Sequence, residues 1–214
     1  MIDIFKDDII GSRSVPNQQI WQLPLKNLFN SWGKQPQDWE LVWGDLFQLE
    51  VSQPEEALKK ALAIKALIKK IRGANPDKKT GILDVRLSLG IGEKTFAGTK
   101  ISESNGSAFI NAAENFEKLR KENRSLGIQS PWPDFDGELN LYLILAGIFM
   151  DKWTVSSAEL IEIVLQHTDL SQEEIGSRLG IKQNSVSGRC KRACVNEVLE
   201  IEHLYRKKLL KLLP

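Results

Sequence analysis

The segment at residues 170–193 constrains the fold more than any other, because it carries the start and turn signals of two consecutive helices. Ser171 and Glu174, three residues apart, have the spacing of a capping box. Gly180 stands where a short turn needs a residue that tolerates a positive φ angle. Val186 then supplies the apolar anchor of the second helix. The pattern predicts a helix-turn-helix over residues 171–193.

The second helix of this segment has a polar and basic surface without an acidic side chain. Asn, Gln and Arg side chains can hydrogen-bond to base edges in the major groove, while Lys and Arg contact phosphates. The candidate DNA-binding residues are Lys182, Gln183, Asn184, Ser185, Ser187, Arg189, Lys191 and Arg192. The alternative is that this turn is purely architectural or binds a protein. We expect double-stranded DNA as the partner.

The net charge of the chain is only +1, so no overall field attracts it to DNA or to a membrane. The basicity is local to residues 182–192, and binding would therefore depend on a specific site and on a dimer. The last helix carries a heptad-like stripe that suits either internal packing or the seam of a homodimer. Its members are Val195, Val198, Leu199, Glu202, Tyr205 and Leu209.

Strand and helix patterns alternate in the N-terminal part of the chain. Apolar alternation and a Gly-Asp turn predict strands at 1–10, 39–43, 46–51 and 83–91. Helical spacing predicts helices at 20–29, 54–73 and 108–121, with a polar connection at 75–81. This order predicts an α+β fold of the βαββαβ, ferredoxin-like type, in which helices cover one face of an antiparallel sheet.

From Glu138 onward only helical patterns occur. They lie at 138–153, 156–168, 171–179 and 183–194, followed by a final long helix that ends near 213. The sequence Ser130-Pro-Trp-Pro133 breaks the chain before them, which places a boundary between 125 and 138. We predict two domains: an α+β domain at 1–130, and an all-helical domain at 138–214 that contains the helix-turn-helix.

Three features favour a cytoplasmic protein that does not contact membranes. The N-terminus carries acidic residues and no long apolar run, so it does not read as a signal peptide. The longest apolar stretch, at 141–150, is too short to span a bilayer. Cys190 and Cys194 lie one turn apart on a predicted helix, which suits two reduced thiols better than a disulfide.

Two carboxylates in the N-terminal part are candidates for a metal site. Asp8 ends the first strand, and Asp45 lies in the hairpin turn that the βαββαβ layout places beside that strand end. Paired carboxylates can bind a divalent cation such as Mg²⁺ or Mn²⁺. Asp also occurs in Gly-Asp turns and after strands for purely local reasons, and spacing leaves both readings open. Arg13, in the loop after Asp8, either contacts a phosphate or is simply solvated.

Four segments occur in an order that resembles the SatD family of bacterial proteins, and the resemblance extends through the helix-turn-helix to nearly the whole chain. They are residues 5–12 (FKDDIIGS), 43–48 (WGDLFQ), 84–93 (DVRLSLGIGE) and 105–113 (NGSAFINAA). More distantly, the same segments resemble the catalytic domain of class III nucleotidyl cyclases. That resemblance implies that Asp8 and Asp45 hold a metal and that Asn111 contacts a nucleotide. The alignment of Ile9 favours Asp8 over Asp7.

The chain also departs from the cyclase pattern. Where the pattern has a base-selecting Lys, this chain has Leu41, and where it has a charge-stabilising Arg, this chain has Asn115. Loss of such a charge stabiliser lowers a rate by orders of magnitude. We therefore expect a DNA-binding transcriptional regulator whose cyclase-like domain senses a ligand or dimerises without catalysis. The alternatives are a metal-dependent nucleotidyl transferase or cyclase, and a protein-interaction module in stress or defence signalling.

Overall fold

The computed structural model describes residues 1–42, 44–71 and 83–213. Trp43 and the polar connection expected at 75–81 lie outside the described residues. The described strands are β1 (Ile2–Ile10), β2 (Trp39–Val42), β3 (Leu46–Val51), β4 (Asp84–Gly92) and β5 (Leu126–Gln129). The described α-helices are α1 (Gln19–Asn30), α2 (Ala57–Lys70), α3 (Ser107–Glu122), α4 (Pro133–Met150), α5 (Val155–Gln166), α6 (Gln172–Leu179), α7 (Gln183–Ala193) and α8 (Val195–Leu209).

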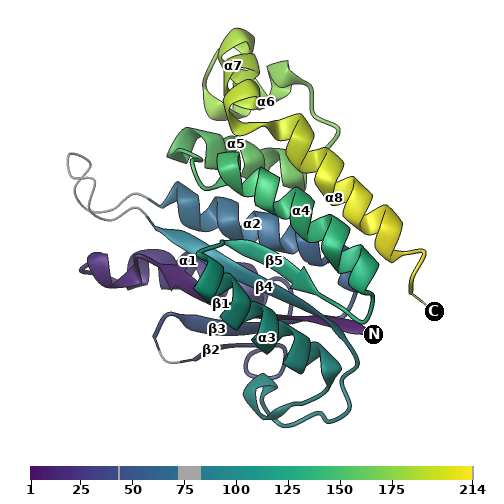
Figure 1. Ribbon diagram of the computed structural model, residues 1–214. Coiled ribbons are helices and arrows are strands. Elements are labelled where there is room, and N and C mark those ends of the chain that lie inside the picture. The colour runs from purple at the N-terminus through teal and green to yellow at the C-terminus, as the bar shows by residue number, and fades with distance from the viewer. Residues whose placement is uncertain (43, 72–82, 214) are drawn as a thin grey trace.

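The strands form one mixed sheet in the order β2-β3-β1-β4-β5 (Figure 1). β1 pairs antiparallel with both β3 and β4, and β2 pairs antiparallel with β3. β5 was not expected, and it pairs parallel to β4 because the crossover through α3 returns the chain in the same direction. The structure therefore confirms a mixed α+β fold and corrects the expectation of a purely antiparallel sheet.

Helices cover both faces of the sheet, which corrects the expectation that one face would be covered. Phe5 and Ile9 of β1 belong to the hydrophobic cluster that includes α1 and α2. Ile4 points the other way and packs with Ala108 and Ala112 of α3. α3 lies very close to β4, because a Cβ atom on Gly90 would collide with the backbone of Ala112. The absence of that Cβ sets the spacing of this layer.

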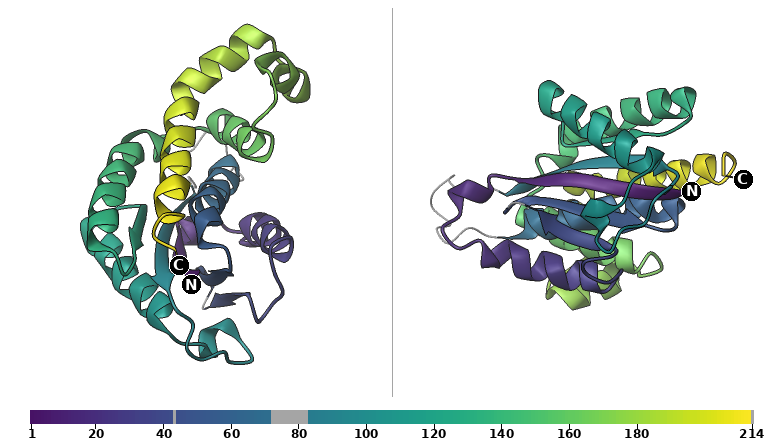
Figure 2. Two further views of the ribbon diagram at one scale, coloured as in Figure 1. Left: turned by 90° about the vertical axis from the view of Figure 1, so that its right-hand side faces the viewer. Right: turned by 90° about the horizontal axis from the view of Figure 1, so that it is seen from below.

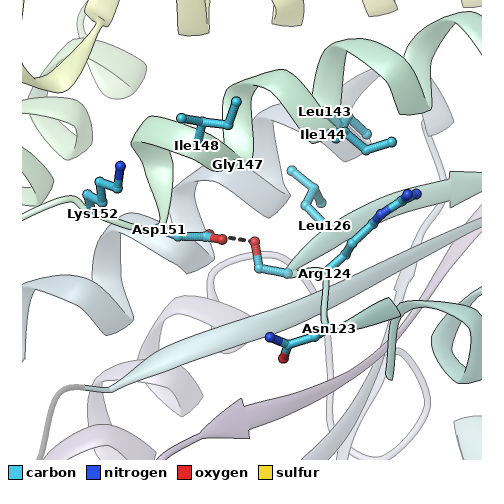
Figure 3. A pocket seen from close by; sticks show the side chains of 10 residues that line it. Asn123, Arg124, Leu126, Leu143, Ile144, Gly147, Ile148, Asp151 and Lys152 are labelled. Atoms are coloured by element: carbon cyan, nitrogen blue, oxygen red, sulfur yellow. Dashed lines mark hydrogen bonds between the residues drawn. The ribbon is translucent and has the colours of Figure 1, made fainter. Parts of the chain in front are cut away.

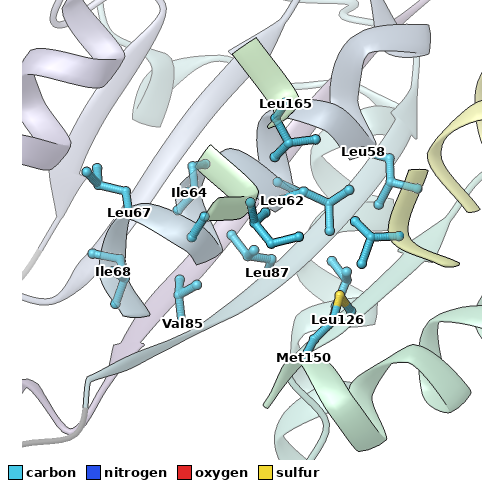
Figure 4. Close-up of a cluster of buried hydrophobic side chains, with 14 of the residues drawn as sticks. Leu58, Leu62, Ile64, Leu67, Ile68, Val85, Leu87, Leu126, Met150 and Leu165 are labelled. Carbon is cyan, nitrogen blue, oxygen red and sulfur yellow. The ribbon is translucent and has the colours of Figure 1, made fainter. Parts of the chain in front are cut away.

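The larger hydrophobic cluster joins the sheet to the C-terminal helices. Leu58 and Leu62 of α2 gather with Leu87 of β4, Leu126 of β5 and Met150 of α4 in a shared core (Figure 4). Burial of such side chains contributes about 1.5–3 kcal/mol each. One cluster thus spans residues from both predicted domains, and the division into 1–130 and 138–214 stays a prediction.

α8 packs inside this arrangement along its apolar stripe. Val198, Tyr205 and Leu209 are each at most 1% exposed. The hydroxyl of Tyr205 donates a hydrogen bond of 2.6 Å to the carbonyl oxygen of Pro54, in the short 3₁₀ helix Pro54–Glu56 that precedes α2. The apolar stripe of α8 is therefore used for packing within the chain and is not available as the seam of a dimer. None of the helices in the described ranges combines the length and apolar character needed to cross a membrane.

A buried ammonium group holds four elements together at one end of the sheet. Lys65 of α2 is 0% exposed, and its Nζ lies 2.8 Å from a carboxylate oxygen of Asp84 and 2.8 Å from one of Asp151. Ser125, just before β5, lies 3.3 Å from the same Nζ and donates a hydrogen bond of 2.6 Å to Asp151. Lys69 adds a second cation, 2.9 Å from Asp84. Because a buried charge must be paired, α2, β4, β5 and the end of α4 are tied together here.

Replacing Lys65→Met should destabilise the protein, because Asp151 loses its cation and Asp84 keeps only Lys69. Breaking a fully buried ion pair on one side typically costs about 3–5 kcal/mol, and the exposure of Asp151 and the remaining Lys69 lower this cost. Urea unfolding followed by circular dichroism measures the change. Lys26→Met on α1 is the control and should have little effect. A loss from Lys65→Met no larger than that from the control would contradict this account.

Two aspartates lie on the core face of β1 beside β4. Asp3 and Asp7 are both 0% exposed, and burial raises the pKa of each carboxyl well above its ordinary value. One oxygen of each accepts a backbone N–H from β4, at 3.0 Å from Gly90 and at 2.7 Å from Ser88. The other oxygen of each has no hydrogen-bond partner among the described residues. These are the features of carboxyl groups that stay protonated in the folded state.

Asp7→Asn should stabilise the protein increasingly as the pH rises. Because the pKa of Asp7 is raised on folding, its protonated form contributes stability below the ordinary value of 3.8, and this contribution is lost as the pH rises through the folded pKa. Asn keeps the oxygen that accepts from Ser88 and cannot ionise. Melting temperatures of both proteins across acidic to alkaline pH test the prediction. A difference in melting temperature that is the same at all pH values would contradict the prediction.

Candidate functional site

The turn between α6 and α7 has the local geometry that the sequence predicts. The Ser171 hydroxyl accepts a hydrogen bond of 3.2 Å from the backbone N–H of Glu174, whose carboxylate accepts one of 2.8 Å from the N–H of Ser171. Both halves of the capping box are therefore present. Gly180 ends α6 with φ of 65°, a left-handed conformation that glycine adopts without strain.

α7 is fixed against α5 and α6 by one of its faces. Val186 and Ala193 are both 0% exposed on this face. The indole N–H of Trp153, in the turn between α4 and α5, donates a hydrogen bond of 3.0 Å to the carbonyl oxygen of Ala193. α6 and α7 lie at the end of the molecule farthest from the sheet (Figure 1). The opposite face of α7 is therefore open to a large partner.

The residues expected to bind DNA gather on and around this open face. The exposed ones are Lys182, Gln183, Asn184, Ser185, Lys191 and Arg192. Ser187 and Arg189 are half-buried, and a guanidinium nitrogen of Arg189 lies 3.5 Å from a carboxylate oxygen of Glu159 on α5. Arg189 thus connects two helices of the protein, a contact that the sequence did not indicate. The structure leaves the N-terminal half of α7 and its last turn as the accessible surface.

The second candidate site lies at the edge where β1 ends. The backbone N–H of Ile9 donates a hydrogen bond of 3.0 Å to the carbonyl oxygen of Asp45, which brings the hairpin turn beside Asp8 as the layout predicts. Burial raises the pKa of the Asp8 carboxyl; Arg86 opposes this shift, and the nearby Asp45 adds to it. Asp45 itself accepts a hydrogen bond of 2.6 Å from the hydroxyl of Ser12.

Arg86 of β4 was missed in the sequence. Its Nη1 lies 2.8 Å and 3.0 Å from the two carboxylate oxygens of Asp8, the residue that faces it across the β1–β4 pair. Both oxygens of Asp8 therefore contact a cation of the protein, and a divalent metal at Asp8 and Asp45 would share this carboxylate with Arg86. The only local signal for Arg86 was a charge within the alternating apolar pattern of β4.

The remaining predicted residues lie apart from Asp8. The side-chain amide of Asn111 donates a hydrogen bond of 2.7 Å to the carbonyl oxygen of Ile91, near the opposite end of β4 from Arg86. Five residues of strand correspond to about 17 Å, so one chain does not bring Asn111 to Asp8. Arg13 is exposed in a short 3₁₀ helix, Ser12–Ser14, that follows the strand.

Asn115, where the cyclase pattern has an Arg, is part of the packed interior. It is 3% exposed and donates a hydrogen bond of 2.9 Å to the hydroxyl of Ser88. That hydroxyl donates in turn to the carbonyl oxygen of Ala112 at 2.7 Å. The side chain thus ties α3 to β4 and does not project toward a ligand. Leu41 lies half-buried on β2, opposite Phe47.

A groove of about 410 Å³ lies between α4 and the segment that joins α3 to β5 (Figure 3). Its walls include Leu143, Ile144 and Ile148 of α4, with Leu126 and Arg124 opposite. The groove is mainly apolar and contains none of the residues proposed from the sequence. Comparison of the chain with models of protein families and with curated proteins gives no match. The resemblance to the SatD family therefore stays a prediction.

We expect millimolar Mg²⁺ or Mn²⁺ to leave the melting temperature of the wild-type protein unchanged, because Arg86 already neutralises Asp8. In Arg86→Ala the carboxylates of Asp8 and Asp45 lose this cation, and either metal should then raise the melting temperature. Arg178→Ala, an exposed change on α6, should behave like the wild type. Stabilisation of the wild type that disappears in Asp8→Asn would show instead that the carboxylates bind a metal despite Arg86.

Proposed function

We propose that this protein is a DNA-binding transcriptional regulator that inserts α7 into the major groove. The observation that carries the proposal is the open face of α7, which is polar, basic and free of acidic side chains. α7 is 11 residues long, or about 16 Å, a length that a major groove accommodates. Its buried face is fixed to the rest of the protein, so a helix presented in this way is pre-organised for binding.

The outward direction of α7 supports a close approach to a nucleic acid. Asn184, Gly188 and Lys191 follow one another at helical spacing, opposite the buried Val186 and Ala193. Gly188 has no side chain at the centre of this face, and Nη1 of Arg192 lies 3.3 Å from where its Cβ would be, so a partner can approach the helix backbone once the flexible Arg192 side chain moves aside. Asn184 can then read a base edge, while Lys191 meets a phosphate. An apolar surface, which a protein partner would favour, does not occur on this face.

We further propose that the N-terminal part has a ferredoxin-like, cyclase-like architecture that senses a ligand or dimerises. The order β2-β3-β1-β4 with antiparallel pairing supports the βαββαβ layout. Among the described residues, two features argue against turnover at Asp8: Arg86 neutralises that carboxylate, and Asn115 is buried where a charge stabiliser would be needed. The ligand that we propose for this part is a nucleotide. We also propose the cytoplasm as the compartment, since a transcriptional regulator needs access to DNA.

Fluorescence anisotropy with labelled fragments of bacterial genomic DNA tests the proposal. We expect salt-sensitive binding to a specific fragment, because phosphate contacts release counterions. Asn184→Ala should weaken binding to that fragment by about 1–3 kcal/mol with less effect on unrelated DNA. Lys191→Ala should weaken binding to all sequences and reduce the dependence on salt, with a change in slope of about one.

Lys121→Ala is the matched control, because it removes one exposed positive charge on α3 and should leave the affinity unchanged. Arg189→Ala is less informative than Asn184→Ala, since it also removes the ion pair with Glu159. Equal losses from Lys191→Ala and Lys121→Ala would indicate general electrostatic attraction. No salt-sensitive binding to any fragment would overturn the proposal.

A further inference from the structure

α4 has apolar side chains on its outer surface as well as on its inner one. Leu139, Leu143 and Met150 face the core and are at most 4% exposed. On the other side of the helix, Leu141, Leu145 and Ile148 are 54%, 51% and 61% exposed. α4 lies on the outside of the molecule beside α8 (Figures 1 and 2). A helix that is apolar all round is normally covered on all sides.

The exposed residues form one line along the helix. Leu141, Leu145 and Ile148 follow at intervals of four and three residues, the spacing of a helix–helix seam. The same intervals lead back to Asp134 in the first turn and forward to Lys152 after the last turn. Both are exposed, and neither forms an ion pair with any described residue. The line therefore has an acidic end, an apolar middle and a basic end.

We infer that the outer face of α4 pairs with α4 of a second copy of this chain in the antiparallel direction. Around a twofold axis near Leu143, Asp134 faces Lys152 of the second copy, and Leu141 faces Leu145 of the second copy. Both contacts occur twice, as a self-complementary interface requires. A parallel pair would place like charges side by side at each end. The charges of Asp134 and Lys152 thus favour a second copy of this chain as the partner and the antiparallel direction of pairing.

The shape of the face agrees with this pairing. The same axis brings Ile148 of one copy level with Glu138 of the other and beside the neighbouring Gly137, where an added Cβ would meet no atom within 4 Å. Gly137 thus provides the space that the larger side chain needs. The groove in Figure 3 continues the apolar surface beside Ile144 and Ile148, so the seam can widen on that side. α8 does not compete for the partner, because its apolar stripe is buried within the chain.

This pairing goes beyond the proposed function and does not depend on it. Sedimentation equilibrium of the full-length protein over the micromolar range measures the self-association. The wild type should form a dimer, and Leu145→Glu should raise its dissociation constant by about tenfold or more, because it places a charge in the seam. Leu23→Glu is the matched control: Leu23 is 56% exposed on α1, and this change should leave the dimer intact.

Exchanging the end charges tests the direction of pairing. Asp134→Lys and Lys152→Asp should each weaken the dimer, and an equimolar mixture of the two variants should restore association, because only the mixed pair joins opposite charges at both ends. Circular dichroism verifies that each variant is folded. A monomeric wild type, or equal effects of Leu145→Glu and Leu23→Glu, would overturn the inference. So would a mixture that associates no better than either variant. A dimer that binds no DNA would leave this inference standing and remove only the proposed function.

Discussion

The ammonium group of Lys65 is the interaction on which the arrangement of the other elements depends. An unpaired cation in this position would be prohibitively costly, so the chain must bring carboxylates to it. Asp84 comes from the start of β4 and Asp151 from the end of α4, and Ser125 precedes β5. The hydrophobic cluster around α2 is compatible with small shifts of its neighbours. Charge pairing requires defined positions, so it sets where the sheet ends and where α4 stops.

The ion pair between Lys65 and Asp151 also helps to position the candidate DNA-binding surface. Asp151 is two residues from Trp153, whose indole N–H holds the last turn of α7 through Ala193. Burial alone would raise the pKa of the Asp151 carboxyl, but Lys65 and Ser125 outweigh this effect and lower it, which keeps the carboxylate charged. A short and continuous set of contacts thus leads from the buried cation to α7. The open face of α7 is therefore held relative to the sheet by packed contacts.

Local signals in the sequence were sufficient for most elements of the fold. Ser171, Glu174 and Gly180 encode the ends of α6 through their own backbone contacts, so neighbouring residues reveal them. β5 was not predicted from the sequence, because a strand of four residues is too short to show a clear hydrophobic periodicity. Contacts between distant residues were also missed: Arg86 reaches Asp8 across 78 positions, and Lys65 reaches Asp151 across 86. Such pairs depend on the topology of the fold, which the spacing of residues along the sequence does not reveal.

Acidic residues near the start of β4 are paired with cations of the protein itself: Lys65 contacts Asp84, and Arg86 contacts Asp8. The carboxylates of Asp8 and Asp45 lie near each other, and positive charge nearby stabilises such a pair. Here Arg86 supplies that charge through its contact with Asp8. Because this cation belongs to the chain, the ion pair forms without a bound ligand. The contact between Asp8 and Arg86 therefore joins β1 to β4 through side chains as well as through the backbone ladder.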